Sequence, residues 1–148
     1  MIDFQDLFIF EPDSWIEALP NYQRVTVASL YEISNDYESV ASAWISASPS
    51  NTVQYGAQKK DNIFLNRICD ELELFLSEDI KYEKEVLELK KYKTVVQLVV
   101  VSAISGFLSP YLGVTAVFLA PVIAILLASI TKIGVQAWLS QRKEKKIE

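Results

Sequence analysis

The feature that most constrains this chain is an uncharged run of 38 residues, Thr94 to Thr131, which lies between Lys93 and Lys132. A single helix of this length would measure about 57 Å, because each helical residue adds about 1.5 Å. The hydrocarbon core of a bilayer is about 30 Å thick and takes about 20 helical residues. One helix is therefore too long for a single span, and the run predicts two spans joined by a turn.

The middle of the run carries the signals of such a turn. Pro110 disfavours helix at the residue before it, and Gly113 accepts the backbone conformation that ends a helix. The sequence therefore predicts a transmembrane hairpin within residues 94–139, made of a first span over 94–109, a turn over 110–113 and a second span over 114–131.

Basic residues flank the hairpin on both sides, and the turn carries no charge. The flanking residues are Lys90, Lys91 and Lys93 before the hairpin, and Arg142, Lys143, Lys145 and Lys146 in a basic tail over 140–148. Lys and Arg collect on the cytoplasmic side of membranes. We therefore expect a multi-pass protein of the inner (plasma) membrane with both termini in the cytoplasm.

Aromatic and basic side chains also fall where the two bilayer interfaces would hold them. Tyr92, Trp138 and Lys132 are expected at the inner interface, and Tyr111 at the outer one. The alternative is a soluble protein that buries a helical hairpin, as pore-forming toxins do.

The chain divides into two parts of opposite charge. Residues 1–89 hold 17 acidic and six basic residues, whereas residues 90–148 hold two acidic and eight basic ones. An acidic N-terminal part argues against nucleic-acid binding. The chain has no histidine and a single cysteine, Cys69, which excludes a disulfide framework, a Cys/His metal cluster and catalysis by imidazole. We expect no enzyme activity and no catalytic, cofactor-binding or metal-binding residues.

Residues 1–77 predict a small acidic helical domain in the cytoplasm, so the whole chain is expected to be all-α. The clearest helix covers 36–47, with Asn35 as its N-cap and Glu38 at capping-box spacing. Further helices are expected over 22–33 and 59–76. Two apolar stripes at helical spacing predict buried faces: Tyr37, Val40, Ala41, Trp44 and Ile45, and then Phe64, Leu65, Ile68, Cys69, Leu72, Phe75 and Leu76.

Two other segments connect or precede these parts. Residues 78–93 predict a juxtamembrane helix with Tyr82, Val86 and Leu89 on one side, and the absence of Gly and Pro between Gly56 and Gly106 allows it to continue into the membrane. The aromatic segment Phe4–Phe10 suits a short strand or a docking segment, and its role stays open.

Small residues recur every four positions in both predicted spans. They are Ala116, Ala120, Ala124 and Ala128 in the second span, and Ser102 and Gly106 in the first. Such faces let helix backbones approach closely in lipid. They predict either packing of the two spans within one hairpin or contact between hairpins of different subunits.

A helical part followed by the uncharged hairpin at 94–131, without catalytic groups, resembles the bacterial two-transmembrane effectors of conflict and anti-phage systems. The resemblance implies a cytoplasmic part that senses a signal or docks a protein partner, and hairpins that form a homo-oligomer and perturb the inner membrane. The alternative is a membrane-anchored adaptor or assembly subunit that holds a partner at the inner face.

Overall fold

The computed structural model describes residues 4–47, 57–92 and 96–147, and every regular element in these ranges is helical. The all-α class predicted from the sequence is therefore confirmed. The elements are the 3-10 helix η1 (Phe4–Phe8), then α1 (Asp13–Glu17), α2 (Asn21–Ser34), α3 (Tyr37–Ala47), α4 (Ala57–Leu76), the 3-10 helix η2 (Ile80–Tyr82), α5 (Glu83–Lys90), α6 (Gln97–Leu112), α7 (Ala116–Ile133) and α8 (Val135–Ile147).

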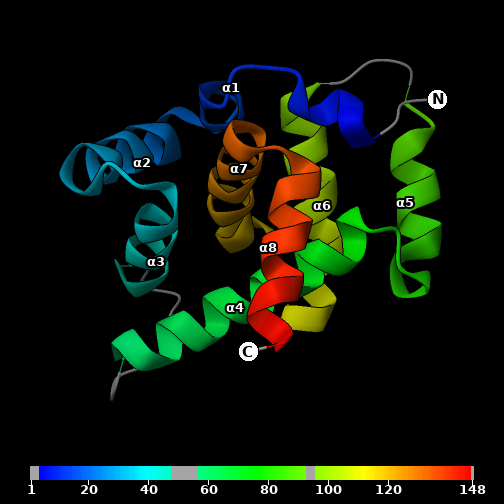
Figure 1. Ribbon diagram of the computed structural model, residues 1–148. Coiled ribbons are helices and arrows are strands. Elements are labelled where there is room, and N and C mark those ends of the chain that lie inside the picture. Colours follow the sequence, from blue (N-terminus) through cyan, green and yellow to red (C-terminus); the bar gives the residue numbers. More distant parts are fainter. Residues whose placement is uncertain (1–3, 48–56, 93–95, 148) are drawn as a thin grey trace.

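Helix α7 lies at the centre of the molecule. It packs against α1, α2 and α3 on one side and against α6 and α8 on the other, as Figure 1 shows. Its residues are apolar all round and 61% of them are buried. A helix without a polar face fits either a protein core or a membrane, and here α7 forms the core.

The two apolar helices begin and end a few residues later than the sequence predicted. Helix α6 runs through Pro110 to Leu112, because the φ angle of proline suits a helix and its missing N–H costs only one hydrogen bond. Gly113 ends α6 with a φ of 72°, a conformation that glycine adopts without strain. The turn thus lies at 113–115 rather than 110–113. Thr115 then caps α7 by accepting a hydrogen bond from the N–H of Phe118 at 3.2 Å.

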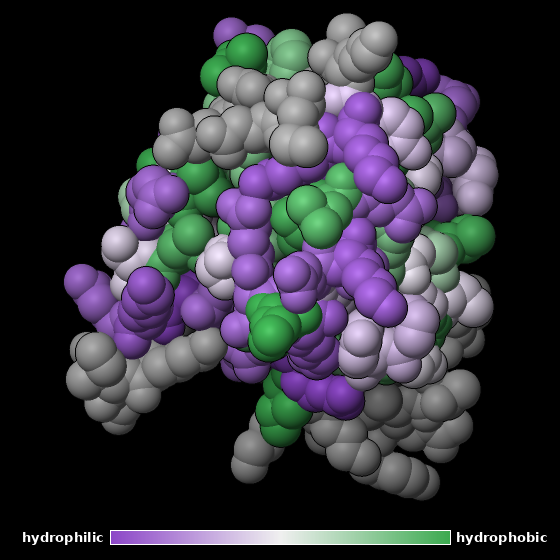
Figure 2. Space-filling view, turned by 90° about the vertical axis from the view of Figure 1, so that its right-hand side faces the viewer, coloured by the Kyte–Doolittle hydropathy of each residue, from purple (hydrophilic) through white to green (hydrophobic). Residues whose placement is uncertain are grey.

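The predicted juxtamembrane helix does not run without a break into α6. It consists of η2 and α5, which ends at Lys90, and Val96 is extended before α6 begins. Its predicted apolar side is confirmed, since Tyr82, Val86 and Leu89 are buried. Its other side is solvated: Figure 2 shows the face of the molecule on which α5 lies as largely hydrophilic, with hydrophobic groups set between the hydrophilic ones.

Further details differ from the sequence predictions or add to them. Asp36, rather than Asn35, caps α3, because its Oδ2 accepts hydrogen bonds from the N–H and the hydroxyl of Ser39. Asn35 instead ends α2 with a φ of 54°, which its short polar side chain tolerates. The basic tail is helical, since it belongs to α8. The segment Phe4–Phe10 contains the 3-10 helix η1 instead of a strand, and Phe4 and Leu7 are buried.

The faces predicted for α3 and α4 are confirmed as packing surfaces. In α3, Val40, Ala41 and Ile45 are fully buried. In α4, Ile68, Leu72 and Phe75 are fully buried as well. Residues 48–56, between α3 and α4 in the sequence, lie outside the described residues, and α4 begins at Ala57.

The helices of the predicted cytoplasmic domain share one core with the apolar hairpin. Helices α1 and α3 pack on α7, and α4 packs on α6. No boundary between a domain over 1–77 and a hairpin is therefore visible in the described residues, and that division stays a prediction.

Candidate functional site

The candidate site is the apolar hairpin, by which we mean α6 and α7 together, and the polar contacts that hold it inside the molecule. Within the described ranges, α7 is the one helix that is both long enough and apolar enough to cross a membrane, while α6 is apolar but shorter. Helix α7 is compatible with membrane association for this reason. Because α7 is mostly buried, it equally meets the requirements of a core helix.

Two tryptophans bind the two ends of α7. Trp15 of α1 is fully buried, and its Nε1 donates a hydrogen bond to Thr131 Oγ1 at 2.8 Å, near the end of α7. Trp44 of α3 is half-buried, and its Nε1 donates to the carbonyl oxygen of Phe118 at 3.3 Å, near the start of α7. Each indole therefore satisfies a polar group of an otherwise apolar helix.

The Trp44 contact lies in the turn of α7 that contains Pro121. Proline has no N–H, so this turn lacks one of the hydrogen bonds that a regular helix makes. The carbonyl that Pro121 leaves without a donor is that of Val117, which is exposed to solvent. Trp44 instead adds a hydrogen bond to the neighbouring Phe118 carbonyl and so attaches this turn of α7 to α3.

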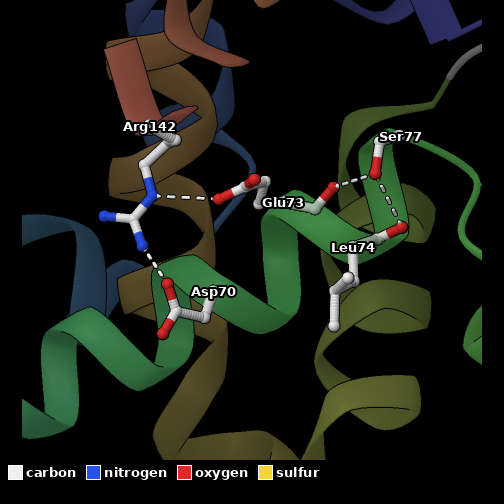
Figure 3. Close-up of polar contacts among 5 residues, drawn as sticks. All are labelled: Asp70, Glu73, Leu74, Ser77 and Arg142. Carbon is white, nitrogen blue, oxygen red and sulfur yellow. Dashed lines mark hydrogen bonds and ion pairs between the residues drawn. The ribbon is translucent and has the colours of Figure 1, made fainter. Parts of the chain in front are cut away.

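Arg142 joins the helix that follows the hairpin to α4. Its Nε donates to Glu73 Oε1 at 3.3 Å, and its Nη2 donates to Asp70 Oδ1 (Figure 3). The side chains of Arg142 and Glu73 are only 11% and 10% exposed, whereas that of Asp70 is 47% exposed. The guanidinium also lies 5.9 Å from the ring of Trp138. This contact attaches α8, and with it the end of α7, to the outer helix α4.

A second polar cluster holds the turn end of α6. Tyr82 is fully buried and its hydroxyl donates to Glu71, which also accepts from Lys81 Nζ at 2.7 Å. Lys81 lies 4.2 Å from the centre of the Tyr111 ring, and Tyr82 packs edge-on against Tyr111. Burial and the hydrogen bond to Glu71 raise the pKa of Tyr82 above its usual value. Tyr111 is thus held by packing and charge at one end of α6.

The small residues singled out in the sequence lie on two different surfaces. Ala124 and Ala128 are fully buried, and Ala116 and Ala120 are partly buried. Ser102 and Gly106, by contrast, are exposed on the outer side of α6. The alanine face packs inside the protein in this arrangement, and its role between subunits stays a prediction.

The four residues predicted as interface anchors differ in how far their side chains are exposed. Tyr92 and Tyr111 are 47% and 43% exposed, and Lys132 is exposed in the last turn of α7. Trp138 is only 7% exposed, because it packs between α8 and the core with Arg142 beside its ring. Trp138 is therefore a packing residue here rather than an exposed anchor. Among the described residues, no group of three or more acidic or sulfur side chains is placed to hold a metal ion.

Sequence reasoning missed the residues that hold the hairpin. The partners of Arg142 lie 69 and 72 positions away in the chain, and those of Trp15 and Trp44 lie 116 and 74 positions away. Pairings this distant leave no local pattern. One signal was present, since Arg142 is the single arginine among the lysines that flank the hairpin, and arginine is the cation best suited to buried ion pairs.

Comparisons with protein-family models, with curated proteins and with solved structures found no match to this chain.

Proposed function

We propose that this protein is a non-enzymatic membrane effector. In its packed form the apolar hairpin lies inside a shell, by which we mean α1, α3 and α4. The hairpin is then released into the inner membrane, where hairpins oligomerise and perturb the bilayer. The observation that carries the proposal is α7 (Ala116–Ile133), an apolar helix whose one charged residue is Lys132 in the last turn and which is long enough to span a membrane. Its 18 residues correspond to about 27 Å, close to the thickness of a bilayer core.

The charges around the hairpin support a defined topology after insertion. No charged residue occurs between Lys93 and Lys132, while lysines and Arg142 lie outside both ends. Two spans with basic flanks place both termini in the cytoplasm and the turn at 113–115 on the outer side. The first span would extend α6 into residues 94 and 95, which lie outside the described residues.

The contacts to the shell support storage of the hairpin before insertion. Trp15, Trp44 and Arg142 attach α7 and α8 to α1, α3 and α4. Lipid would offer α7 the same apolar surroundings that the shell provides, but no partners for these polar groups. A cytoplasmic protein partner that engages the shell helices is therefore expected to increase release beyond the level that expression of the chain alone produces.

Cysteine labelling in spheroplasts tests the insertion. Val117 is 67% exposed at the start of α7, next to the turn, and Ser140 is exposed on α8. In a Cys69→Ala background, we expect a membrane-impermeant maleimide to label Val117→Cys from outside the cell and Ser140→Cys only after lysis. Labelling of both positions only after lysis, together with recovery of the protein in the soluble fraction, would overturn the proposal.

Membrane potential separates an effector from an adaptor. We expect expression of the full chain to slow growth and to collapse the membrane potential, as read by a potential-sensitive dye. Correct insertion with an unchanged potential would reject the effector activity and favour an adaptor that anchors a partner at the membrane.

A further inference from the structure

The outer side of α2 is an exposed apolar surface. Figure 1 shows α2 at the edge of the molecule, beyond α1 and α3, against which its inner side packs. Val27 on the inner side is buried. On the outer side, Tyr22, Val25 and Ile33 are 66%, 55% and 83% exposed. Single apolar residues on a surface are ordinary, but three on one side of a 14-residue helix indicate a contact surface.

The hydroxyl groups on this side of α2 are satisfied within the helix itself. Thr26 Oγ1 donates to the carbonyl oxygen of Tyr22 at 3.0 Å, and Ser29 Oγ donates to that of Val25 at 3.1 Å. Burial of a polar group is costly where its hydrogen bond is lost. Another protein surface can therefore cover the outer side of α2 without leaving these hydroxyl donors unpaired.

The outer side carries one positive and one negative charge, Arg24 and Glu32. Both residues are exposed, and neither forms an ion pair among the described residues. Arg24 donates to Asn21 Oδ1 of its own helix at 2.8 Å. Helix α2 is thus neutral, although the whole chain has a formal net charge of −5. A neutral surface with two unpaired charges suits a partner that presents the same two charges in the reverse order.

The positions of these residues fit an antiparallel pair of α2 helices. Helical spacing places Tyr22 and Ile33 along one edge of the outer side, and Arg24 and Glu32 toward the opposite edge. Both pairs are centred at or next to Ala28. A two-fold axis beside Ala28 brings like edges of the two helices together. Tyr22 then lies opposite Ile33 of the second copy, and Arg24 lies opposite its Glu32.

We propose that the packed form is a two-fold dimer, in which α2 pairs antiparallel with α2 of a second copy of this chain. The dimer buries Tyr22, Val25 and Ile33 of both copies and forms two Arg24–Glu32 ion pairs. One pair of helices buries less than the about 1,200–2,000 Å² of a standard interface, so we expect a dissociation constant of about a micromolar or weaker. The inference goes beyond the proposed function, because it concerns the packed form rather than the inserted hairpin.

Sedimentation of the full chain over a range of concentrations tests the dimer. We expect a monomer–dimer equilibrium in the wild-type protein. Val25→Lys should raise the dissociation constant at least about tenfold, because it places two ammonium groups inside the interface. Leu87→Lys is the matched control, since Leu87 is 50% exposed on α5. Neither substitution should lower the Tm, because both side chains are already exposed in the monomer.

Charge reversals test the antiparallel register. Arg24→Glu and Glu32→Arg each place like charges across the interface twice, so each should weaken dimerisation about tenfold. A mixture of the two variants should recover the wild-type affinity, because every contact in the mixed dimer again joins opposite charges. Lys143→Glu makes the same change in net charge as Arg24→Glu, on an exposed residue of α8, and should leave the dimer unchanged.

Disulfide formation tests the position of the axis. In a Cys69→Ala background, Ala28→Cys should cross-link two copies under mild oxidation, because residue 28 lies opposite its own copy beside the two-fold axis. Ser140→Cys, which is exposed on α8, is the control and should stay uncross-linked.

Each remaining outcome overturns the proposal. A chain that stays monomeric up to about 100 μM forms no such dimer, and a dimer that Val25→Lys leaves intact uses another surface. Mixed charge variants that fail to recover affinity reject the antiparallel register. Loss of vesicle flotation in Val25→Lys, with a monomeric wild-type chain, assigns the outer side of α2 to lipid. The Val117→Cys labelling separates this inference from the proposed function: dimerisation without insertion rejects the effector mechanism alone, while insertion of a chain that is monomeric when packed rejects the α2 dimer alone.

Discussion

Loss of the Arg142 side-chain charge should loosen the attachment of α8 and of the hairpin end to α4. In Arg142→Gln, the carboxylate of Glu73 stays buried at 10% exposure without its guanidinium partner. Removal of one member of a buried ion pair costs about 3–5 kcal/mol. The bond to Asp70 contributes less, because that side chain is 47% exposed and an exposed ion pair contributes at most about 1 kcal/mol.

We therefore expect Arg142→Gln to lower the free energy of unfolding by about 3 kcal/mol, which corresponds to about 10 °C in Tm for a chain of this size. The measurement is a thermal melt of the full chain by circular dichroism. Lys143→Gln is the matched control: Lys143 is exposed on the same helix, and its substitution should change stability by less than about 0.5 kcal/mol.

A double variant separates the buried charge from general damage to α8. Arg142→Met combined with Glu73→Leu removes both charges and keeps similar volumes, so it should recover most of the lost stability. Under the proposed function, Arg142→Gln should also increase labelling of Val117→Cys from outside spheroplasts, since the hairpin is released more readily. A Tm within about 2 °C of Lys143→Gln would refute the view that this pair holds the packed form.

Other contacts give further expected outcomes. Burial and the bond to Glu71 raise the pKa of Tyr82, so its contribution to stability should be constant below about pH 10 and be lost as pH rises beyond it. Tyr82→Phe should reduce this alkaline loss in pH-dependent melts. Ala124 is fully buried, so Ala124→Phe places a bulky ring where only a methyl group fits and should destabilise the packed form by about 1–3 kcal/mol in a thermal melt. An unchanged Tm would show that this face is free for another subunit. Trp44→Phe keeps the ring but removes the donor to the Phe118 carbonyl, and should cost about 1 kcal/mol in denaturant unfolding.

The alkaline prediction affects how membrane association is measured. Extraction with carbonate at about pH 11 falls in the range where ionisation of Tyr37 and Tyr82 favours the unfolded chain, since burial raises the pKa of both. Release into the soluble fraction at that pH would report unfolding as well as the absence of a span. Flotation at neutral pH avoids this ambiguity.

The sequence predicted the amphipathic helices and left open whether the hairpin packs in lipid or in a protein core, for a physical reason. Helices such as α3 have one apolar face, so their spacing alone shows which side is buried, and Val40 and Ile45 confirm it. Helix α7 has no polar face, so its pattern is equally compatible with lipid and with a protein core. The composition of α7 is the same in both environments. Its place in the core follows from α1 and α3, whose apolar faces are buried against it.

The break before α6 and the separate helix α8 illustrate a second limit. No Gly or Pro marks the end of α5 at Lys90, and α5 packs beside α6 instead of continuing into it. A local signal did exist at Gly134, whose φ of 96° is strained for other residues and which separates α7 from α8. The predicted hairpin region over 94–139 includes that glycine, because apolar residues continue beyond it to Leu139.

Release of the hairpin would expose the apolar faces of the shell helices α1 and α3 to water. Helices α1 and α3 pack on α7, and Trp15, Val40 and Ile45 of these helices are fully buried. Exposure of each such side chain to water costs about 1.5–3 kcal/mol, so three of them together approach the whole stability of a small domain. The hairpin loses nothing comparable, because lipid solvates α7 as well as the shell does. The free-energy cost of exposing these faces therefore opposes insertion. A protein partner or a second copy that covers the faces of α1 and α3 would remove this cost and so favour insertion. A partner that binds these faces is thus expected to bind the inserted form and not the packed one.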